Sequence, residues 1–378
     1  MCSNLRFHNY SKYRITIAFT SLSFLLFITS CSENREANIN INDFHKVTEN
    51  PVLSPDSSFI FIDPITRQRV KWQQADVFNP AAIVRDGKIF MLYRSEDNPA
   101  EGIGRRTSRL GLAESEDGIH FKKFPEPVLY PDSSEYMQYD YPGGCEDPRL
   151  VQTEEGLYVI AYTAWNNITA RLSIAFSNDL IHWQKKGPAF VKAYNGKFLN
   201  SWSKSGSMIT KMIKGKQVLA RINGKYWMYW GEHLINLAWS DNLYEWNPLL
   251  NEKGELLSLA APRPGMFDSD LTECGPPAII INDGIVLLYN GKNSNNDNAA
   301  PELPRGTYST GRIVFDKNDP KKVIERSDTS FLRPSLPHEL TGQYQAGTTF
   351  AEALVFFKGR WFLYYGTADS FVGLAIAE

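Results

Sequence analysis

Hydrophobic and polar positions along the chain form a short unit that recurs five times. Each copy has two apolar runs around a polar turn, as in AAIVRDGKIFMLYRS from Ala81 and ALVFFKGRWFLYYGTAD from Ala353. Apolar runs that flank a glycine-containing polar turn predict β-hairpins. The turn glycines are separated by 69, 68, 60 and 75 residues, so the unit spans the chain: Gly87, Gly156, Gly224, Gly284 and Gly359.

A second phrase follows each hairpin. It reads SRLGLAESEDGIHF from Ser108, RLSIAFSNDLIHW from Arg171 and INLAWSDNLYEW from Ile235, with shortened forms from Ser309 and Phe371. Radial repetition of four-stranded sheets protects the edges of all-β proteins, so five copies predict an all-β fold, a five-bladed β-propeller in one domain. The equivalent His120 and His182 are interpreted as hairpin or packing residues, because Glu245 fills the same slot in the third copy.

Composition limits the classes of partner. The formal net charge is −2 and no basic stripe is present, so nucleic acid is not an expected partner. The chain has 9 Trp, 18 Tyr and 22 Phe, which suit both the packing of wide sheets and contact with the C–H faces of sugar rings.

The first 50 residues have a different character. Lys12 and Arg14 precede the apolar run ITIAFTSLSFLLFIT, and Cys31 follows directly after Ser30. This arrangement is typical of a bacterial lipoprotein: a signal peptide of residues 1–30, an acylated Cys31, a polar tether of residues 31–50 and a catalytic domain of residues 51–378. The alternative is a transmembrane helix, but the run is shorter than the roughly 20 residues that a span needs. We therefore expect a protein of the bacterial cell envelope, periplasmic or surface-facing, that contacts the membrane through its lipid alone.

Two cysteines remain in the expected mature domain. Cys145 and Cys274 lie at the starts of different blades, so we expect them to be buried and free, although an oxidising compartment would also permit a disulfide.

Polar residues gather where a propeller exposes its strands to the axis. The innermost strand of each blade starts at the central pocket, and the second strand ends there. The expected starts contain Asn79-Pro80, Glu146-Asp147-Pro148-Arg149, Ser205-Gly206-Ser207, Glu273 and Glu352, and the expected ends are Arg94, Trp165, Glu232, Asn290 and Asp369. Crowded acids, amides and arginines are costly unless a ligand or a reaction uses them.

The most specific of these segments is YPGGCEDPRL, residues 141–150. Two glycines allow close approach, two acids are adjacent, and Pro148 and Arg149 follow. An ion pair that merely joins blades is the alternative interpretation. Because successive residues of a strand point to opposite faces, we expect only one of Glu146 and Asp147 to face the pocket.

Three acids from separate blades suit one reaction. Inverting cleavage of a glycosidic bond needs an acid for the leaving oxygen and a base for water, with carboxyl groups about 6.5–9.5 Å apart. Asp147 is expected from the second blade, Glu232 from the third and Glu273 from the fourth. Crowding of like charges separates pKa values and so divides the two roles.

Several of these segments together resemble glycoside hydrolase family 130. They are GGCEDPRL, Asn79-Pro80, Arg94 in LYRSED, GPPAI after Glu273, and Asp369 in YYGTAD, over residues 75–378. The resemblance implies a five-bladed propeller that cleaves β-mannosides with inversion, as a phosphorylase or, in a subgroup, as a hydrolase. It also implies that Asp147 is the general acid, acting in the phosphorylases through a sugar hydroxyl, and that Asn79, Arg94, Arg149 and Asp369 hold the mannosyl unit.

Hydrolysis is favoured over phosphorolysis by two glutamates. A phosphorylase needs basic side chains around its phosphate, yet WGEHL and LTECGPP place Glu232 and Glu273 there, where they are suited to activate water. The alternative is that these glutamates pair with His233, Arg263 or Lys204 and do no chemistry. His233 alone could also support a phosphate site.

The sequence thus predicts an exo-acting β-mannoside hydrolase whose partner is a manno-oligosaccharide, with β-1,2-linked substrates preferred. A β-mannoside phosphorylase and a non-catalytic glycan-binding lipoprotein are the alternatives. Asn290, Ser207 and His233 are further expected substrate contacts, and Tyr139 and Trp202 are the better candidates for stacking on sugars. Histidine and cysteine are not clustered, so we expect no metal and no cofactor.

Overall fold

The computed structural model describes residues 40, 43–102, 104–282 and 284–378. Every described residue belongs to one compact unit, Glu36–Glu378. The expected signal peptide of residues 1–30 and the expected acylation site Cys31 therefore lie outside the described residues. Within the described part of the chain, no helix is both long enough and apolar enough to cross a membrane.

The first part of the described chain forms two groups of antiparallel strands. In each group four consecutive strands pair in chain order. The first group is β4 (Asp76–Arg85), β5 (Lys88–Glu96), β6 (Ser108–Ser115) and β7 (Lys122–Lys123), and the second is β8 (Gly144–Gln152), β9 (Tyr158–Trp165), β10 (Ala170–Ser177) and β11 (Trp183–Pro188). One parallel bridge between Ser108 and Gly144 joins them. Gly144 has φ +118°, and a Cβ there would lie 2.1 Å from the Ser108 carbonyl oxygen, so this junction requires glycine.

The third and fourth groups are less regular. The third contains β12 (Ser207–Met208), β15 (Arg221–Ile222), β16 (Lys225–Trp230), β17 (Ile235–Ser240), β18 (Asn247–Pro248) and β19 (Ser258–Ala260). A hairpin of β13 (Thr210–Ile213) and β14 (Lys216–Leu219) follows β12 in the chain. Its strand β13 pairs in parallel with β21 (Ile279–Ile281) of the fourth group. The fourth group contains β20 (Leu271–Cys274), β21 (Ile279–Ile281), β22 (Gly284–Lys292), β23 (Tyr308–Phe315) and β24 (Val323–Arg326).

The fifth group combines both ends of the described chain. It contains β25 (Thr349–Phe357), β26 (Arg360–Thr367), β27 (Phe371–Ala377) and the early strand β1 (His45–Lys46). β1 pairs with β27, and the Asn50 side chain bonds both backbone polar groups of Leu374. Residues 45–50 therefore belong to the folded body, which corrects the tether and domain boundary expected at Pro51. The reason is physical, since β1 covers the otherwise open edge of β27.

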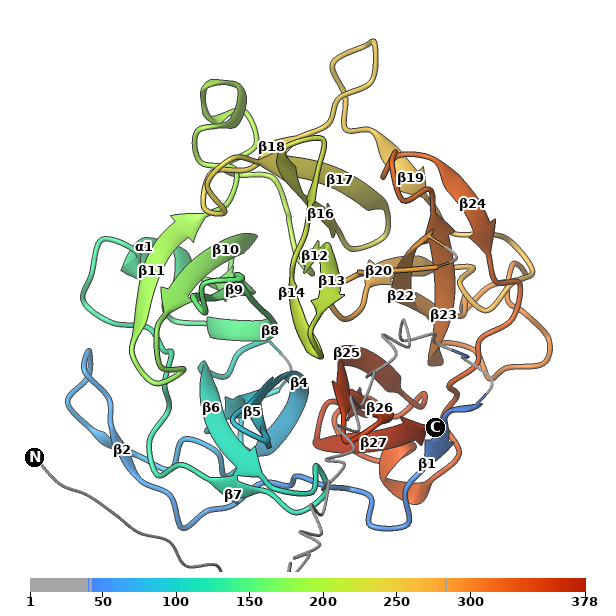
Figure 1. Cartoon of the computed structure of the whole chain (residues 1–378). Coiled ribbons are helices and arrows are strands. Elements are labelled where there is room, and N and C mark those ends of the chain that lie inside the picture. The colour runs from blue at the N-terminus through green and yellow to red at the C-terminus, as the bar shows by residue number, and fades with distance from the viewer. Residues whose placement is uncertain (1–39, 41–42, 103, 283) are drawn as a thin grey trace, which may run out of the picture. The chain divides into compact units, whose positions relative to one another are not determined.

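The described part of the unit has an all-β fold, as expected from the five repeated hairpins. Its remaining elements are small: β2 (Phe61–Ile62), β3 (Arg69–Val70), the helix α1 (Met137–Asp140) and two 3₁₀ helices, Ala193–Gly196 and Pro337–Glu339. Within the unit, the five strand groups follow one another around a common centre (Figure 1). Strand pairing among the described residues forms no closed sheet.

The second repeated phrase is a strand followed by a side-chain-capped turn. Ser115 Oγ accepts a hydrogen bond from the Gly118 N–H, and Asp117 accepts from the two following N–H groups. The turn from Ser177 repeats these contacts with Asp179, and Asn242 replaces the aspartate in the next turn. Side chains of this type compete well for backbone donors at turns, which explains the recurring letters.

The repeated histidines belong to these turns. The Nδ1 atoms of His120 and His182 lie 2.8 and 2.7 Å from the aspartate of their own turn, and their side chains are 77% and 85% exposed. They are therefore hairpin residues, and the alternative interpretation as packing residues is wrong.

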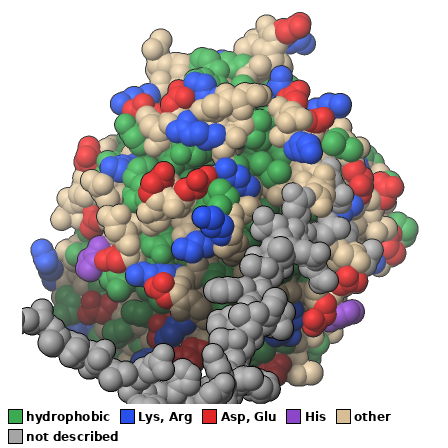
Figure 2. All heavy atoms as spheres, viewed as in Figure 1, with side chains coloured by type: hydrophobic (Ala, Val, Ile, Leu, Met, Phe, Trp, Pro, Cys, Tyr) green, Lys and Arg blue, Asp and Glu red, His purple; other side chains and the backbone are tan. Residues whose placement is uncertain are grey.

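Aromatic side chains fill the spaces between neighbouring groups. Phe190 packs on Trp230 with ring centroids 4.6 Å apart, and Tyr229 stacks on Phe315 at 4.3 Å. Burying such a side chain stabilises a fold by about 1.5–3 kcal/mol. Cys145 and Cys274 are buried and free, as expected. On the face drawn in Figure 2, acidic and basic side chains are interspersed outside the grey atoms.

Candidate active site

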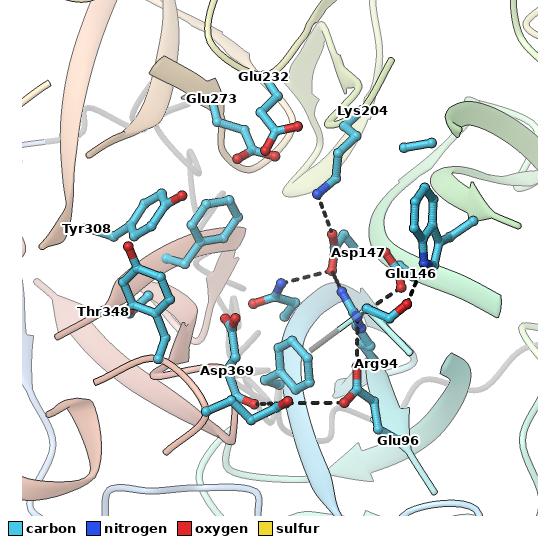
Figure 3. A pocket seen from close by; sticks show the side chains of 18 of the residues that line it. Arg94, Glu96, Glu146, Asp147, Lys204, Glu232, Glu273, Tyr308, Thr348 and Asp369 are labelled. Atoms are coloured by element: carbon cyan, nitrogen blue, oxygen red, sulfur yellow. Dashed lines mark hydrogen bonds and ion pairs between the residues drawn. The ribbon is translucent and has the colours of Figure 1, made fainter. Parts of the chain in front are cut away.

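Residues from all five strand groups surround one cavity of about 340 Å³. Its lining combines acids, two cations, amides and aromatic rings: Phe78, Asn79, Arg94, Glu96, Gly104, Glu146, Asp147, Trp165, Ala170, Trp202, Lys204, Glu232, Glu273, Tyr308, Gln343, Tyr344, Thr348, Phe350 and Asp369. Figure 3 shows ten of them labelled, with their side chains directed toward a shared space.

Two matching bulges present Asn79 and Asp147. Strand pairing shifts register between Phe78 and Pro80 in β4, and between Glu146 and Arg149 in β8. Asn79 and Asp147 have φ angles of +46° and +48°, a conformation that costs energy for a residue other than glycine and that often marks functional sites. Asn79 Nδ2 donates to Asp147 Oδ1 at 2.8 Å.

The bulge in β8 changes which side chains face the cavity. Glu146 and Asp147 both line it, and both are buried at 6% and 4% exposure. The expectation that only one of them faces the pocket is therefore wrong. Strict alternation of faces holds only for regular strand backbone, and the left-handed residue at Asp147 interrupts it.

Arg94 gathers three carboxylates. Its guanidinium nitrogens lie 2.7 Å from Glu96, 2.9 Å from Glu146 and 3.1 Å from Asp147. The guanidinium also lies over the Phe78 ring, 4.7 Å from its centroid. A fork of five donors on one rigid plane is suited to hold several acids in fixed positions. Arg94 therefore orients the acids and is itself largely neutralised.

The two adjacent acids of β8 are held in different protonation states. Burial raises the pKa of Glu146 to about 7, and the neighbouring Asp147 charge adds to this against the attraction of Arg94. Burial acts on Asp147 in the same direction, but Arg94 and Lys204 outweigh it and hold the pKa of Asp147 below its usual range. Near neutral pH, Asp147 is ionised and Glu146 is close to its titration midpoint.

Glu232 and Glu273 form a second acidic pair opposite Asp147. They are partners in an isolated antiparallel bridge between the third and fourth groups, so their side chains start as cross-strand neighbours. Figure 3 shows both carboxyl groups at the same end of the cavity. Trp202 Nε1 donates to Glu232 Oε2 at 2.6 Å, and Ser205 Oγ donates to Glu273 Oε1. Burial, with the charge of Glu232, raises the pKa of Glu273 to about 7 despite the nearby Lys204.

Lys204 lies between the two sets of acids. Its Nζ is 3.7 Å from Asp147 Oδ2. Burial opposes its charge, yet Glu232, Glu273 and Asp147 outweigh burial and raise the pKa of Lys204 well above its usual value. From the sequence, Lys204 was expected only as a possible ion-pair partner of the glutamates and was not among the expected site residues.

The cavity has a large excess of acid. Six of its lining residues are carboxylic acids and two are basic, Arg94 and Lys204. Asp369 is one of the acids, and burial raises its pKa to about 6 against the attraction of Arg94. Since Arg94 already contacts three carboxylates, little positive charge remains for an added anion.

Seven of the twelve expected catalytic and substrate-binding residues line this cavity. They are Asn79, Arg94, Asp147, Trp202, Glu232, Glu273 and Asp369. Five do not: Arg149, Asn290, Ser207, Tyr139 and His233.

Arg149 lies beneath the cavity, where it is 1% exposed. It donates to the carbonyl oxygens of Cys274, Gly275 and Asp147, and its Nη1 lies 2.7 Å from Glu352 Oε1. The bulge in β8 adds one residue between Glu146 and Arg149 and so inverts the alternation of faces. The Arg149 side chain therefore contacts neighbouring strand groups and is not among the residues that line the cavity.

Asn290 and Ser207 also join strand groups. The Asn290 amide bonds both backbone polar groups of Ala351, and Ser207 Oγ lies within 2.9 Å of the carbonyl oxygens of Gly275 and Pro276. Tyr139 lies under the Arg171 guanidinium, 5.4 Å from its ring centroid, and lines a separate surface groove. His233 is exposed, with φ +71°.

Several residues that line the cavity were not among those expected from the sequence. Glu96 follows Arg94 by two residues on β5, so the period of a strand places both side chains on one face and could have identified it. Gln343 and Tyr344 precede β25 in a loop, and no local pattern marks them.

Comparisons with known proteins agree on one family. The model of glycoside hydrolase family 130, described as β-1,4-mannooligosaccharide phosphorylase, matches residues 43–378. A glycosyl hydrolase from Bacteroides ovatus has a crystal structure that is similar, with 49% identity, a TM-score of 0.86 and coverage of 88% of this chain and 93% of that chain.

Two further relatives carry more specific descriptions. One structure comes from a report that family 130 of mannoside phosphorylases contains glycoside hydrolases targeting β-1,2 mannosidic linkages in Candida mannan; it shows 52% identity, a TM-score of 0.87 and coverage of 88% and 93% of the two chains. The 1,2-β-oligomannan phosphorylase of Thermoanaerobacter sp. (strain X514) is 30% identical over 340 residues, 88% of this chain and 96% of that protein.

Proposed function

Because the chain belongs to glycoside hydrolase family 130, whose enzymes act on mannosides as glycosidases or phosphorylases, we propose that it is an inverting, exo-acting β-mannoside hydrolase. Its proposed substrates are β-1,2-linked manno-oligosaccharides, from which it releases mannose. The observation that carries the proposal is the acid excess of the cavity, six carboxylic acids against two basic residues.

Phosphate is poorly matched to this cavity. Phosphorolysis requires the anion beside the anomeric carbon, where arginine and lysine normally neutralise it. Arg94 is engaged by three acids, and Lys204 is surrounded by Asp147, Glu232 and Glu273. A phosphate ion would meet carboxylates at short range in a buried site, where like charges repel strongly.

Water is better matched. Glu232 and Glu273 are held side by side, and one oxygen of each accepts a side-chain hydrogen bond, from Trp202 and Ser205 respectively. Their other oxygens are suited to bind a water molecule and to accept its proton. Asp147 comes from the second strand group and faces the pair across the cavity (Figure 3). Attack and leaving-group protonation from opposite sides of a sugar give inversion.

The proton for the leaving oxygen is assigned to Asp147, with Glu146 as its reserve. Arg94 contacts both carboxyl groups, and Glu146 is close to half protonated near pH 7. A proton shared by the pair can reach the leaving oxygen from Asp147, directly or through a hydroxyl of the bound sugar. In the second route the hydroxyl passes its proton to the leaving oxygen and regains one from protonated Glu146 by way of Asp147, which its lowered pKa keeps ionised and able to orient the hydroxyl.

Asp147→Asn tests this assignment. The amide keeps the size of the side chain but can neither relay a proton nor orient the sugar hydroxyl as an anion, so kcat on β-1,2-mannobiose should fall by about 10²–10⁴-fold while the sugar still binds. Steady-state kinetics and calorimetric titration with mannobiose measure the two effects. A rate close to that of the unmutated protein would remove Asp147 from the acid role.

Exo action is supported by the closed side of the cavity. Gln343 Nε2 donates to Glu96 Oε2 at 3.2 Å, and the same glutamate oxygen lies 3.0 Å from Arg106. This network ties the loop before β25 to β5 beside Asp369. We expect this loop to stop a continuing chain on that side and to leave room for a terminal sugar.

Phosphorolysis is the second candidate. It is favoured by the 30% identical 1,2-β-oligomannan phosphorylase and by the description of the family model. The hydrolase described for β-1,2 linkages is closer in sequence, at 52% identity, and supports both the reaction and the linkage that we propose.

Phosphate dependence separates the two candidates. The unmutated protein is incubated with β-1,2-mannobiose and, separately, β-1,4-mannobiose, each with and without phosphate. We expect phosphate-independent release of mannose from the β-1,2-linked substrate. Strict dependence on phosphate, with mannose 1-phosphate as product, would establish the second candidate.

We also propose that the five strand groups are the blades of a five-bladed β-propeller. Their order around a common centre in Figure 1 and the pairing of β1 with β27 support this. An experimental structure with five blades around one axis is the test.

Attachment to the bacterial envelope is a further proposal. It rests on the charged segment, the apolar run and Cys31, all outside the described residues. Replacing Cys31 with serine should abolish incorporation of labelled palmitate and release the protein from the membrane fraction. Unchanged membrane association of that variant would contradict lipid anchoring.

A further inference from the structure

Three of four consecutive residues contact the three acids assigned to the reaction. Trp202 donates its indole N–H to Glu232, Lys204 lies 3.7 Å from Asp147, and Ser205 donates its hydroxyl to Glu273. The segment Trp202–Ser205 precedes β12 and therefore stands between both acidic sets of the cavity.

The backbone of this segment is held firmly. The Ser203 N–H donates to the Ala170 carbonyl oxygen at 3.0 Å, and Ser203 Oγ accepts from the Leu172 N–H at 3.0 Å. The Lys204 carbonyl oxygen accepts from the Gly231 N–H, directly before Glu232. These bonds to β10 and to the Glu232 turn fix where the Trp202 side chain starts.

Trp202 differs from the other members of the segment in its exposure. Its side chain lines the cavity, yet the residue is 51% exposed. Its ring meets Trp165 edge to face, with centroids 5.6 Å apart. An exposed indole at the rim of a sugar site is the usual kind of surface on which a sugar ring packs. Asp147, which is assigned to the leaving oxygen, is by contrast only 4% exposed.

We propose that Trp202 is a positioning residue for Glu232 and that the sugar of the leaving group, packed on the same indole, holds it in place. This inference rests on the proposed hydrolase function. The indole has one N–H donor, which Glu232 occupies, and one apolar ring, which remains for the sugar. A sugar on the ring restricts the indole and thereby restricts Glu232, which together with Glu273 holds the attacking water.

The consequence is that binding of the leaving sugar improves the chemical step as well as affinity. Binding energy from a part of the substrate that does not react can be used in this way to orient a catalytic group. A second sugar should therefore raise kcat, and methyl β-mannoside, which lacks that sugar, should gain little from Trp202.

Two substitutions of Trp202 separate the two roles. Trp202→Phe keeps an aromatic ring and removes the N–H, so kcat on β-1,2-mannobiose should fall about 10-fold while KM changes less than about 2-fold. Trp202→Ala should lower kcat similarly and also raise KM for mannobiose about 10-fold, with little effect on KM for methyl β-mannoside. Equal rises in KM for both substrates would contradict contact with the leaving sugar.

Trp165→Phe is the matched comparison. Trp165 lines the same cavity, but its N–H donates to the backbone carbonyl oxygen of Gly104 and to no acid. The change in kcat of Trp165→Phe therefore measures the effect of removing an indole hydrogen bond that does not orient a carboxylate. A fall in kcat as large as that of Trp202→Phe would overturn the special role of Trp202. Thermal unfolding of each variant checks that the fold is retained.

A double-mutant cycle tests whether Trp202 acts through Glu232. In a Glu232→Asp background the shorter side chain draws the carboxylate away from the indole, so Trp202→Phe should lower kcat by less than about 2-fold. The same 10-fold loss in both backgrounds would show that Trp202 acts otherwise and would overturn the proposal. Failure of the unmutated protein to hydrolyse mannobiose without phosphate would instead contradict the proposed function itself.

Discussion

Neighbouring carboxyl groups in this cavity differ because their surroundings differ. Asp147 faces Asn79, Arg94 and Lys204, and these contacts favour its ionised form. Glu273 accepts from Ser205 but lies beside Glu232, and burial dominates its environment. Near neutral pH, Asp147 is therefore ionised, so the proton for the leaving oxygen comes from Glu146 by way of Asp147, and Glu273 acts as base through its ionised fraction.

The raised pKa of Glu273 predicts an acidic limb in the rate profile. Glu273 must be ionised to accept a proton from water, and its pKa is about 7. Below that pH, kcat/KM should fall about tenfold for each unit as Glu273 takes up a proton. Measurement of phosphate-free hydrolysis across the pH range tests this. A rate that stays constant well below pH 6 would exclude Glu273 as the base.

Glu273 should also lower the stability of the fold at high pH. The folded state binds the Glu273 proton more tightly than the unfolded chain, so its stabilising contribution is complete at low pH and is lost as pH rises through about 7. Glu273→Gln has no charge to bury. Its free energy of unfolding should exceed that of the unmutated protein by about 2–3 kcal/mol at pH 8 and match it near pH 4.

Denaturant titration at these two pH values measures the difference. Equal stability at pH 8 would contradict a costly buried charge. Greater stability together with lost activity would identify Glu273 as a residue kept for function at the expense of stability.

At the level of elements, the bulges decide which side chains reach the cavity. The rule that strand starts face the axis correctly placed Asn79, Asp147 and Glu273. It failed at Arg149 and Ser207, whose side chains turn to neighbouring groups. A bulge adds one residue and inverts the alternation beyond it, and no letter in the sequence states where the register shifts. Asn79-Pro80 and Asp147-Pro148 share one dipeptide type and one backbone conformation, which is a usable signal for this bulge.

Arg149 joins strands of different groups, so its replacement should change the stability of the fold. It ties β8 to the residues after β20 and to Glu352 of β25, which is fully buried. Arg149→Met leaves Glu352 without its cation and three carbonyl oxygens without this donor. The free energy of unfolding should fall by about 3–5 kcal/mol. Arg149→Met combined with Glu352→Gln should recover part of the loss. A loss below about 1 kcal/mol in the single variant would contradict the tie.

Across the whole unit, the repeat pattern was the most informative feature of the sequence. Five hairpins and five following strands were predicted, and five strand groups are present. Each repeat is recognised from one continuous stretch of sequence. It therefore could not indicate that β1, from the opposite end of the chain, supplies the last strand of the fifth group. The domain boundary at Pro51 came instead from the polar composition of residues 31–50, which does not show that His45 and Lys46 pair with β27. The repeat also did not reveal the loop residues Gln343 and Tyr344.

Either water or phosphate must attack the anomeric carbon of the mannoside. Acids from separate strand groups surround one cavity with an excess of negative charge, so water rather than phosphate should reach the anomeric carbon. The most direct measurement is NMR and mass spectrometry of β-1,2-mannobiose turnover in ¹⁸O-labelled water with excess phosphate present. We predict α-mannose as the first product, with ¹⁸O at its anomeric carbon. Mannose 1-phosphate without ¹⁸O at the anomeric position would contradict the account.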